Sequence, residues 1–395
     1  MNKTTSRTRR RFLAEGTALA ALSTAPWKVV AAESSEQLPS ATDLFAADVV
    51  REVVRTMPSG NVLLSPVSMQ AALALAAVGA RGETRERFQA ALGLSSLEPA
   101  DIHAHFASLM LQAMRAVFVR NVPVEPAYAK AVSDGLYADV RELPEDPREA
   151  VRIVNDWADE ATHHRIRHLY DDLPAVPLLL TDAVYLKFRW RHAFDAAKTH
   201  ERLFHRADGS AVSVPMMTTL QAAYAGKCRA GMFVQLPFDG VQGGVDLVLP
   251  RLGLSAEAAL DITLRSGPDF FPESDWRDYW TEVDLALPRL ELRSSLSLQE
   301  AASRAGLGSV LDHADLSGIS PALASSSVGA ILQQAWMKAD EEGVEAAAVT
   351  SVGVSGSVRP KSPPLKLVFD RPFALVIRDR NVLFAAVVRD PAIPA

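Results

Sequence analysis

The chain has 395 residues, of which 48% are hydrophobic and 22% are charged, a composition that excludes a disordered or fibrous protein. Its net charge of -6 argues against a basic nucleic-acid-binding surface, so we expect no nucleic acid among its partners. A single cysteine, Cys228, excludes an intramolecular disulfide and every Cys-x-x-Cys metal or redox site.

The first 32 residues have the order of a secretory signal. Arg9, Arg10 and Arg11 precede Phe-Leu and a mostly small, apolar run over 14–25, and small residues at 31–32 suit a peptidase. The arginines before Phe-Leu indicate the twin-arginine type of a bacterial exported protein, the alternative being a chance arginine cluster. Cleavage after residue 32 would remove six basic residues and one acidic residue, which changes the net charge to -11. We therefore expect a periplasmic or secreted (extracellular) protein, with no membrane contact once residues 1–32 are removed.

Apolar periodicity predicts mainly helices in the first half of the mature chain. The helical segments are 41–57, 67–78, a helix from 84, 101–116 and 149–169, and a short strand is predicted over 61–64. Ser65 and Pro66 supply a cap and a first-turn proline for the helix over 67–78, which is apolar on nearly every side and should be buried.

The second half reads mainly as strands. They are predicted over 178–188, 233–237, 245–250 and 281–292, with two more within 365–388, a helix over 297–306, and either a strand or a helix over 328–339. Helices followed by strands indicate an α+β fold. No interior linker marks a second domain, so residues 33–395 are expected to form one domain.

Residues 340–364 fit neither pattern. About 25 mostly small Gly-, Ser- and Pro-rich residues between strands are far longer than an ordinary connection, and such loops are usually functional. Elsewhere no nucleophile-elbow, P-loop, zincin or dinucleotide-binding motif occurs. His164 and His168 could share a metal, but adjacent arginines favour a solvated helix face, and Cys228 is interpreted as a structural thiol. We therefore expect no catalytic residue, metal or cofactor.

Six motifs in chain order resemble those of the serpins, protease inhibitors that act by loop insertion. They are Asn61–Ser68, Gly79–Thr84, Asn155–Ile166, Asp315–Ser320, Glu341–Ala348 and Phe369–Phe373. The resemblance implies three β-sheets, eight or nine helices and an exposed reactive-centre loop over about 341–364. It also implies that a protease cuts this loop, that the acyl-enzyme is trapped, and that the cut loop enters the main sheet as a new strand.

The resemblance further assigns residues within the loop. The hinge comprises Glu341, Glu342, Gly343, Val344, Glu345, Ala346, Ala347 and Ala348. Family spacing places the reactive bond at Ser357-Val358, with a register uncertain by one to three residues. Arg359 is the alternative for a trypsin-like enzyme, but it precedes a proline, so small neighbours favour elastase-like or subtilisin-like targets.

The hinge residues make physical sense as a future strand. Every second residue from Val344 to Val354 is uncharged and most are small, so these positions can be buried at little side-chain entropy. Gly343 offers a pivot. From the residues alone, the start of an Ala-rich helix is the competing interpretation.

The resemblance also assigns a gate beneath the main sheet. The gate residues are Ser65, Ser68, Asn155, Asp182 and Gln333, and Trp190 and Arg289 lie in the upper sheet, where Arg289 matches a salt bridge to the hinge. Asp182 and Gln333 replace the asparagine and histidine that are usual there. A buried carboxylate needs donors or a proton, and the hydroxyls of Ser65 and Ser68 are the expected donors. Phe188 replaces a usual glycine, and the sequence gives no physical account of it.

The sequence thus predicts a monomeric, single-use serine protease inhibitor that is not an enzyme, with papain-like cysteine proteases as a second target class. A non-inhibitory serpin, either a plain substrate or a ligand carrier, is the first alternative, and an exported hydrolase is the second. The acidic mature chain argues against a heparin-type activator.

Overall fold

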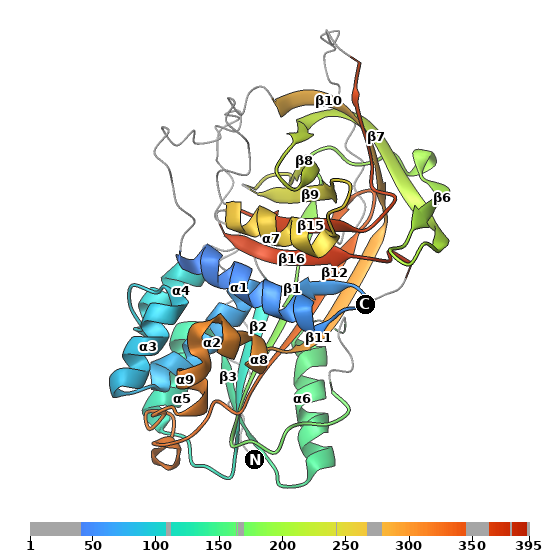
Figure 1. The fold of residues 1–395 in the computed structure, drawn as a ribbon. Coiled ribbons are helices and arrows are strands. Elements are labelled where there is room, and N and C mark those ends of the chain that lie inside the picture. The colour runs from blue at the N-terminus through green and yellow to red at the C-terminus, as the bar shows by residue number, and fades with distance from the viewer. Residues whose placement is uncertain are drawn as a thin grey trace. The chain divides into compact units, whose positions relative to one another are not determined.

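Two β-sheets and the helices packed on them make up the described part of this computed structural model (Figure 1). The structure describes residues 41–107, 112–162, 164, 170–241, 243–266, 279–344, 363–379 and 381–392. The predicted signal over 1–32 lies outside them and stays a prediction. Among these residues, no helix is both long and apolar enough to cross a membrane.

Six of the nine helices among the described residues lie within or beside segments predicted to be helical, and those over 126–136, 256–266 and 308–312 are not predicted. The helices are α1 (Ala41–Thr56), α2 (Pro66–Gly79), α3 (Gly82–Leu92), α4 (Pro99–Ala107), α5 (Pro126–Leu136), α6 (Pro147–Ala161), α7 (Ala256–Ser266), α8 (Gln299–Ala302) and α9 (Gly308–Asp312). Ser65 caps α2, its hydroxyl accepting from the Ser68 N–H, and Asp146 caps α6 by accepting from the N–H groups of Arg148 and Glu149.

The first sheet joins nine strands among the described residues. Its order is β1 (Val62–Leu64), β16 (Val382–Val388), β15 (Phe373–Arg378), β9 (Gly244–Pro250), β8 (Gly231–Pro237), β7 (Ala211–Lys227), β10 (Trp280–Pro288) and β14 (Leu365–Val368), and β6 (His200–His205) pairs with β7. The 17-residue strand β7 pairs with β6 and β10 and, through its last four residues, with β8. This long strand connects two of the three expected sheets into one hydrogen-bonded network.

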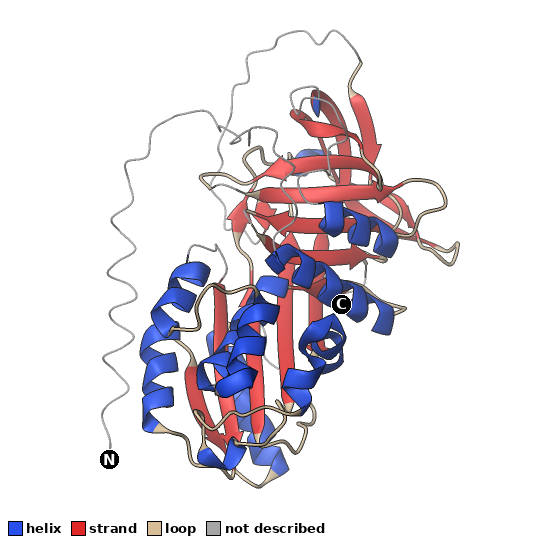
Figure 2. Ribbon diagram, turned by 60° about the vertical axis from the view of Figure 1, so that its left-hand side comes forward, coloured by secondary structure: helices blue, strands red, loops and turns tan. Residues whose placement is uncertain are grey.

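The second sheet has seven strands in the described chain. Its order is β3 (Asp139–Leu143), β2 (Gln112–Arg120), β4 (Leu178–Tyr185), β12 (Ala330–Ala339), β13 (Gly343–Val344) and β5 (Phe188–Arg189), with β11 (Leu290–Ser297) also paired to β12. Figure 2 shows most of the helices gathered around this sheet.

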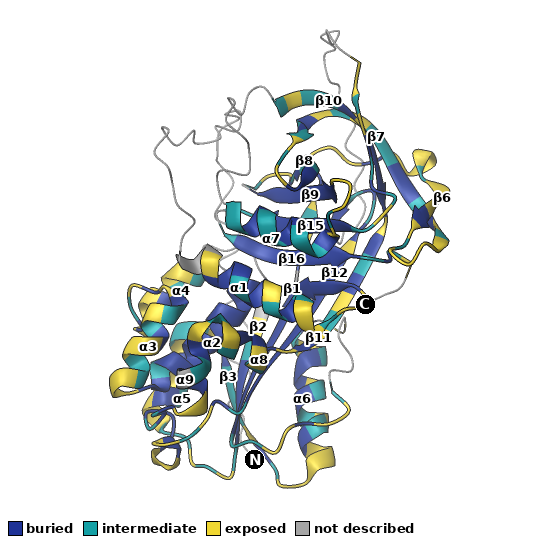
Figure 3. Cartoon of the chain, in the orientation of Figure 1, coloured by how far each residue is buried: buried dark blue, intermediate teal, exposed yellow. Residues whose placement is uncertain are grey.

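The two faces of the second sheet are covered by different helices. Alternate residues of β4 divide between them: Leu178 and Leu180 join the core cluster that contains α2, whereas Leu179 and Ala183 pack with Trp157 of α6. The strands are mostly buried (Figure 3). A side chain on β4 therefore faces either α2 or α6 according to its parity.

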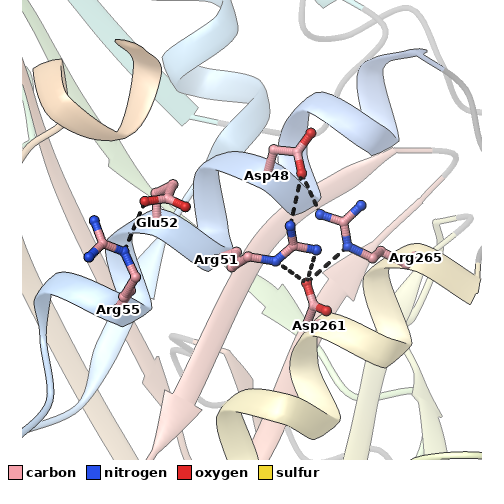
Figure 4. Close-up of polar contacts among 6 residues, drawn as sticks. All are labelled: Asp48, Arg51, Glu52, Arg55, Asp261 and Arg265. Atoms are coloured by element: carbon pink, nitrogen blue, oxygen red, sulfur yellow. Dashed lines mark hydrogen bonds and ion pairs between the residues drawn. The ribbon is translucent and has the colours of Figure 1, made fainter. Parts of the chain in front are cut away.

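Ion pairs join α1 to α7 at the edge of the first sheet. Asp261 accepts from Arg51 at 3.1 Å and from Arg265 at 3.0 Å, and Asp48 contacts both arginines (Figure 4). These side chains are about one third to one half exposed, so each pair contributes little by itself.

Several sequence predictions differ from the structure. The helix predicted over 149–169 ends at Ala161, and the strand predicted over 178–188 is divided into β4 and β5. The helix predicted over 101–116 ends at Ala107, and residues 112–116 begin β2, whose Ala-Val-Phe-Val run favours a buried strand. The single strand over 281–292 is divided at Arg289 into β10 and β11, which belong to different sheets. The block 365–388 holds three strands. The open assignment over 328–339 resolves as strand β12.

Candidate functional site

The second sheet contains a seam between two parallel strands that divides at its upper end. We define the seam as the paired residues 179–185 of β4 and 330–336 of β12. Three residues further along, β12 no longer pairs with the continuation of β4: Val344 of β13 lies between them, opposite Ala339 on one side and Phe188 on the other. At this fork the sheet therefore holds one strand more than at the seam. Neighbouring strands are about 4.8 Å apart, so β12 and β5 are separated here by about two such spacings.

Glu341 ties the hinge to the first sheet. Its carboxylate accepts from Arg289 Nε at 2.9 and 3.0 Å and from the Thr199 hydroxyl at 2.5 Å. Burial raises the pKa of Glu341, but the donors Arg289 and Thr199 outweigh burial and leave this pKa below its ordinary value. Glu341 is therefore held as an anion at the base of the fork.

Trp190 ties the hinge backbone to β5. Its indole N–H donates to the Asp340 carbonyl at 2.8 Å, and its backbone N–H donates to the Glu342 carbonyl at 3.0 Å. The Phe188 ring stacks on Phe238 at a centroid distance of 4.6 Å, and Trp190 stacks on the same ring at 5.8 Å. This aromatic stack is the physical account of Phe188 that the sequence does not give.

Gly343 allows the hinge to approach β5 closely. A Cβ atom at this position would lie 2.1 Å from the Phe188 carbonyl oxygen and 2.7 Å from Arg189 Cα, and both of these atoms belong to the backbone. No other residue fits between the strands without moving them. The glycine therefore allows β13 to pair with β5, in addition to the pivot that the sequence predicts.

A buried polar cluster crosses the seam. Asp182 of β4 lies opposite Gln333 of β12 and accepts a hydrogen bond from its amide nitrogen at 3.1 Å. Ser68 donates its hydroxyl proton to the other oxygen of Asp182 at 2.7 Å, as the sequence predicts. Ser65 contributes its backbone: its N–H donates to Gln333 at 2.8 Å and its carbonyl accepts at 2.9 Å. Both edges of the seam are therefore bonded to the N-terminus of α2.

Asp182 is only 1% exposed, and this burial raises the pKa of its carboxyl. Three groups act in the opposite direction: the charge of Arg115, then the hydrogen bonds from Ser68 and Gln333. The Arg115 Nε lies 3.6 Å from Asp182 Oδ1, and its side chain is 17% exposed. An arginine from β2 therefore offsets part of the burial of this carboxyl, whose pKa stays above its ordinary value.

A family model described as "Serpin (serine protease inhibitor)" matches residues 40–391, which includes the fork, the seam and both sheets. The chain belongs to the serpin family.

Curated serpins from distant organisms align along most of the chain. Serpin A3-3 of Bos taurus is 28% identical over 385 residues, which cover 90% of this chain and 89% of the relative. Iripin-8 of Ixodes ricinus is 29% identical, covering 83% and 87%. An uncharacterized serpin-like protein of Thermococcus kodakarensis is 26% identical, covering 94% and 89%.

Solved serpin structures share the fold. Serpin48 of the insect Tenebrio molitor superposes with a TM-score of 0.74 at 25% identity, covering 89% of this chain and 97% of that chain. Human thyroxine-binding globulin, solved in complex with its hormone, gives a TM-score of 0.77 at 22% identity, covering 89% and 98%. The serpin fold therefore serves proteins of more than one function.

The structure separates one predicted gate residue of this serpin from the others. Asn155 lies on α6, which covers the face of the sheet opposite to α2, and it bonds the backbone of Tyr170 at both N–H and carbonyl, each at 3.0 Å. It fastens the segment after α6, whereas Asp182, Gln333, Ser65 and Ser68 form the cluster on the α2 face.

Arg115 is the residue of the cluster that sequence reasoning missed. Its segment was predicted to be helical, so the register that places it opposite Asp182 could not be drawn. The available signal is a lone arginine inside the apolar run Ala-Met-Arg-Ala-Val-Phe-Val, since a buried arginine requires a partner.

The remaining predicted positions cannot be placed. Glu345 to Ala348, Ser357, Val358 and Arg359 lie outside the described residues. Within the described residues no cluster of metal-ligating side chains occurs, and His164 bonds Asp159 at 2.7 Å. Burial raises the pKa of the half-buried Cys228 thiol, which favours an unreactive thiol.

Proposed function

We propose that this serpin is a monomeric, single-use inhibitor of serine proteases that is cut within residues 341–364 and then inserts the cut segment into the seam. The fork carries the proposal, because the first strand residues of the hinge already lie between the two strands that must separate. Serpins are generally protease inhibitors, and the family membership supports the same assignment.

The register of β13 gives the order in which an inserted segment would pair. Val344 lies opposite both Ala339 and Phe188, and an antiparallel strand moves one position down each neighbour per residue. Continued along the seam, this register brings Thr350 between Asp182 and Gln333. A threonine hydroxyl both donates and accepts, so it can replace the hydrogen bond that the two residues lose on separation.

The same register gives a parity to the hinge. Val344 is 1% exposed and packs in the core cluster behind the sheet, so every second residue after it would face that core. These residues are Ala346, Ala348, Thr350, Val352 and Val354, and none carries a charge. Each new ladder hydrogen bond contributes roughly 0.5–1.5 kcal/mol, so about a dozen would give the inserted state a large advantage.

The loop sequence supports a target class. The proposed bond Ser357-Val358 has small neighbours, which suit the narrow pockets of elastase-like or subtilisin-like proteases, with papain-like cysteine proteases as a second class. We further propose export through residues 1–32 to the periplasm or the medium, with residues 33–395 as the single mature domain.

The test is to mix the mature protein with elastase, subtilisin and trypsin and to separate the products on a denaturing gel. We expect a band at the summed mass that survives boiling, formed with elastase or subtilisin. Protease whose active-site serine has been blocked beforehand is the control and should give no such band. Cleaved serpin beside fully active protease would instead assign a substrate-like, non-inhibitory protein.

A further inference from the structure

Three side chains form one row across three neighbouring strands. The register places Arg115 of β2 opposite Asp182 of β4, and Asp182 opposite Gln333 of β12. All three strands belong to the sheet that would have to open, and α2 covers the row. The seam runs between Asp182 and Gln333, so Arg115 and Asp182 lie on the same side of it.

Opening of the seam breaks the hydrogen bond between Asp182 and Gln333. Ser65 and Ser68 belong to the same end of α2, so two strands separated by a further strand cannot both keep their bonds to it. Arg115, 3.6 Å from Asp182, lies on the strand next to β4 and stays with Asp182 whichever edge moves. The buried carboxylate is therefore never left without a compensating cation while the strands are apart.

The alternative state of Asp182 is a protonated one, which burial favours. Gln333 presents an amide N–H to one oxygen of Asp182, so the proton would have to lie on the other oxygen, which faces the Ser68 hydroxyl. The groups that face Asp182 are Arg115 from β2, Ser68 from α2 and Gln333 from β12. Tyr170, after α6, interacts with its charge. Burial raises the pKa of Tyr170, so this phenol stays neutral. Arg115 is thus the only cation among the described groups that act on Asp182.

We propose that Arg115 is a positioning residue for loop insertion, which compensates the buried Asp182 carboxylate and so sets the fraction of protease encounters that end in a trapped complex. This rests on the inhibitory function proposed above. Without Arg115, an inserting strand would have to close over a bare carboxylate. Insertion would be slower, and more acyl-enzymes would be hydrolysed before they are trapped.

The experiment compares Arg115→Gln with the wild type between about pH 5 and 8, first by the thermal midpoint of the intact protein. The pKa of the Asp182 carboxyl is raised on folding, so its contribution to stability is present in acid and is lost as the pH rises through this folded-state pKa. Removal of the Arg115 charge raises the folded-state pKa of Asp182 further. We therefore expect the two midpoints to be close at the acid end and to diverge as the pH rises. Parallel curves would overturn the proposal.

The second readout is the number of inhibitor molecules consumed per protease molecule trapped. In Arg115→Gln this ratio should rise at least about threefold from the acid to the alkaline end. The reason is that Asp182 loses its proton as the pH rises and then has no cation beside it. Arg115→Lys should restore most of the wild-type profile, and a wild-type ratio in Arg115→Gln at every pH would contradict the proposal.

The double variant Arg115→Gln, Asp182→Asn guards against a single variant that fails to fold. It carries no charge in this row, so we expect it to fold and to show no pH dependence beyond the background in either readout. Persistence of the pH dependence in this variant would also overturn the proposal. If the wild type traps no protease, the proposed inhibitory function fails, whereas the thermal midpoints still decide whether Arg115 controls Asp182.

Discussion

At the scale of single residues, Glu341 connects the hinge to the rest of the molecule. It belongs to the hinge, yet its partners Arg289 and Thr199 come from the ends of other strands. Only 9% of its side chain is exposed, compared with 47% for Arg289. Water reaches the Arg289 side of the ion pair and weakens its electrostatic attraction, so the pair contributes less to the free energy of unfolding than a fully buried pair would.

We predict that Glu341→Gln lowers the free energy of unfolding of the uncut protein by about 0.5–1 kcal/mol at neutral pH. The pKa of Glu341 is lowered on folding, so its contribution is full above the ordinary carboxylate value and is lost as the pH falls below about 4.5. Urea unfolding at several pH values should show the deficit vanishing in acid. The control Arg293→Gln, at an exposed ion pair, should show a smaller deficit, and an acid-independent deficit in Glu341→Gln would contradict the assignment.

At the scale of elements, β13 consists of only two residues, but it fixes both the register and the parity of everything that follows. Val344 faces the core behind the sheet, so the next residue, Glu345, would face the other side, where its neighbours in the continued register are the exposed Lys187 and Lys338. Adjacent hinge positions should therefore respond very differently to substitution.

We predict that Val344→Arg converts the inhibitor into a substrate, because a guanidinium would have to enter the apolar core for β13 to form. The ratio of inhibitor consumed to protease trapped should rise at least about tenfold, a barrier change of about 1.4 kcal/mol, with the protease recovered in active form. Glu345→Gln is the matched control in the same segment and should leave the ratio near that of the wild type. Equal ratios for the two variants would exclude the parity proposed for the hinge.

Local signals account for the elements that could be predicted. The cap at Ser65, the first-turn proline and the apolar surface of α2 are read directly from neighbouring residues. The beginning of β2 was predicted as helix because its identity as a strand depends on pairing with β4 rather than on local periodicity. The strand β13 has only two residues, too few to show an alternating apolar pattern in the sequence. It forms because β12 and β5 both pair with it.

The candidate site divides in the same way. The contacts of Asp182 with Gln333 and of Glu341 with Arg289 could be predicted from the resemblance to serpins, whose spacing carries long-range information. Asn155 was grouped with the gate because spacing along the chain does not say which face of the sheet a helix covers. Arg115 was missed because an ion pair between strands requires the register of both.

At the scale of the whole molecule, β13 separates β12 from β5 at the fork, but among the described residues no strand continues it into the seam of the uncut protein. Residues 179–185 and 330–336 pair with each other, although each edge could pair with a new antiparallel strand. Insertion would keep the number of sheet edges constant and would replace the one row of ladder hydrogen bonds between β4 and β12 with two rows, one on each side of the new strand. The cut, inserted form should therefore be the more stable one.

We predict that a single cut within 345–362 raises the thermal midpoint by more than about 10 °C, because roughly ten new ladder bonds contribute about 0.5–1.5 kcal/mol each. Differential scanning calorimetry of intact and cut protein measures the shift. Val344→Arg, cut at the same bond, is the control and should gain much less. A midpoint unchanged by cutting would mean that the wild-type segment does not insert.

The indole of Trp190 also provides an intrinsic optical reporter. It is 5% exposed, hydrogen-bonded to the chain just before β13 and stacked on Phe238, so departure or completion of the hinge strand alters its surroundings directly. The chain has six tryptophans, so in a variant that retains only Trp190 the fluorescence emission would follow the seating of the hinge in real time, without an attached dye, separately from cleavage of the bond itself.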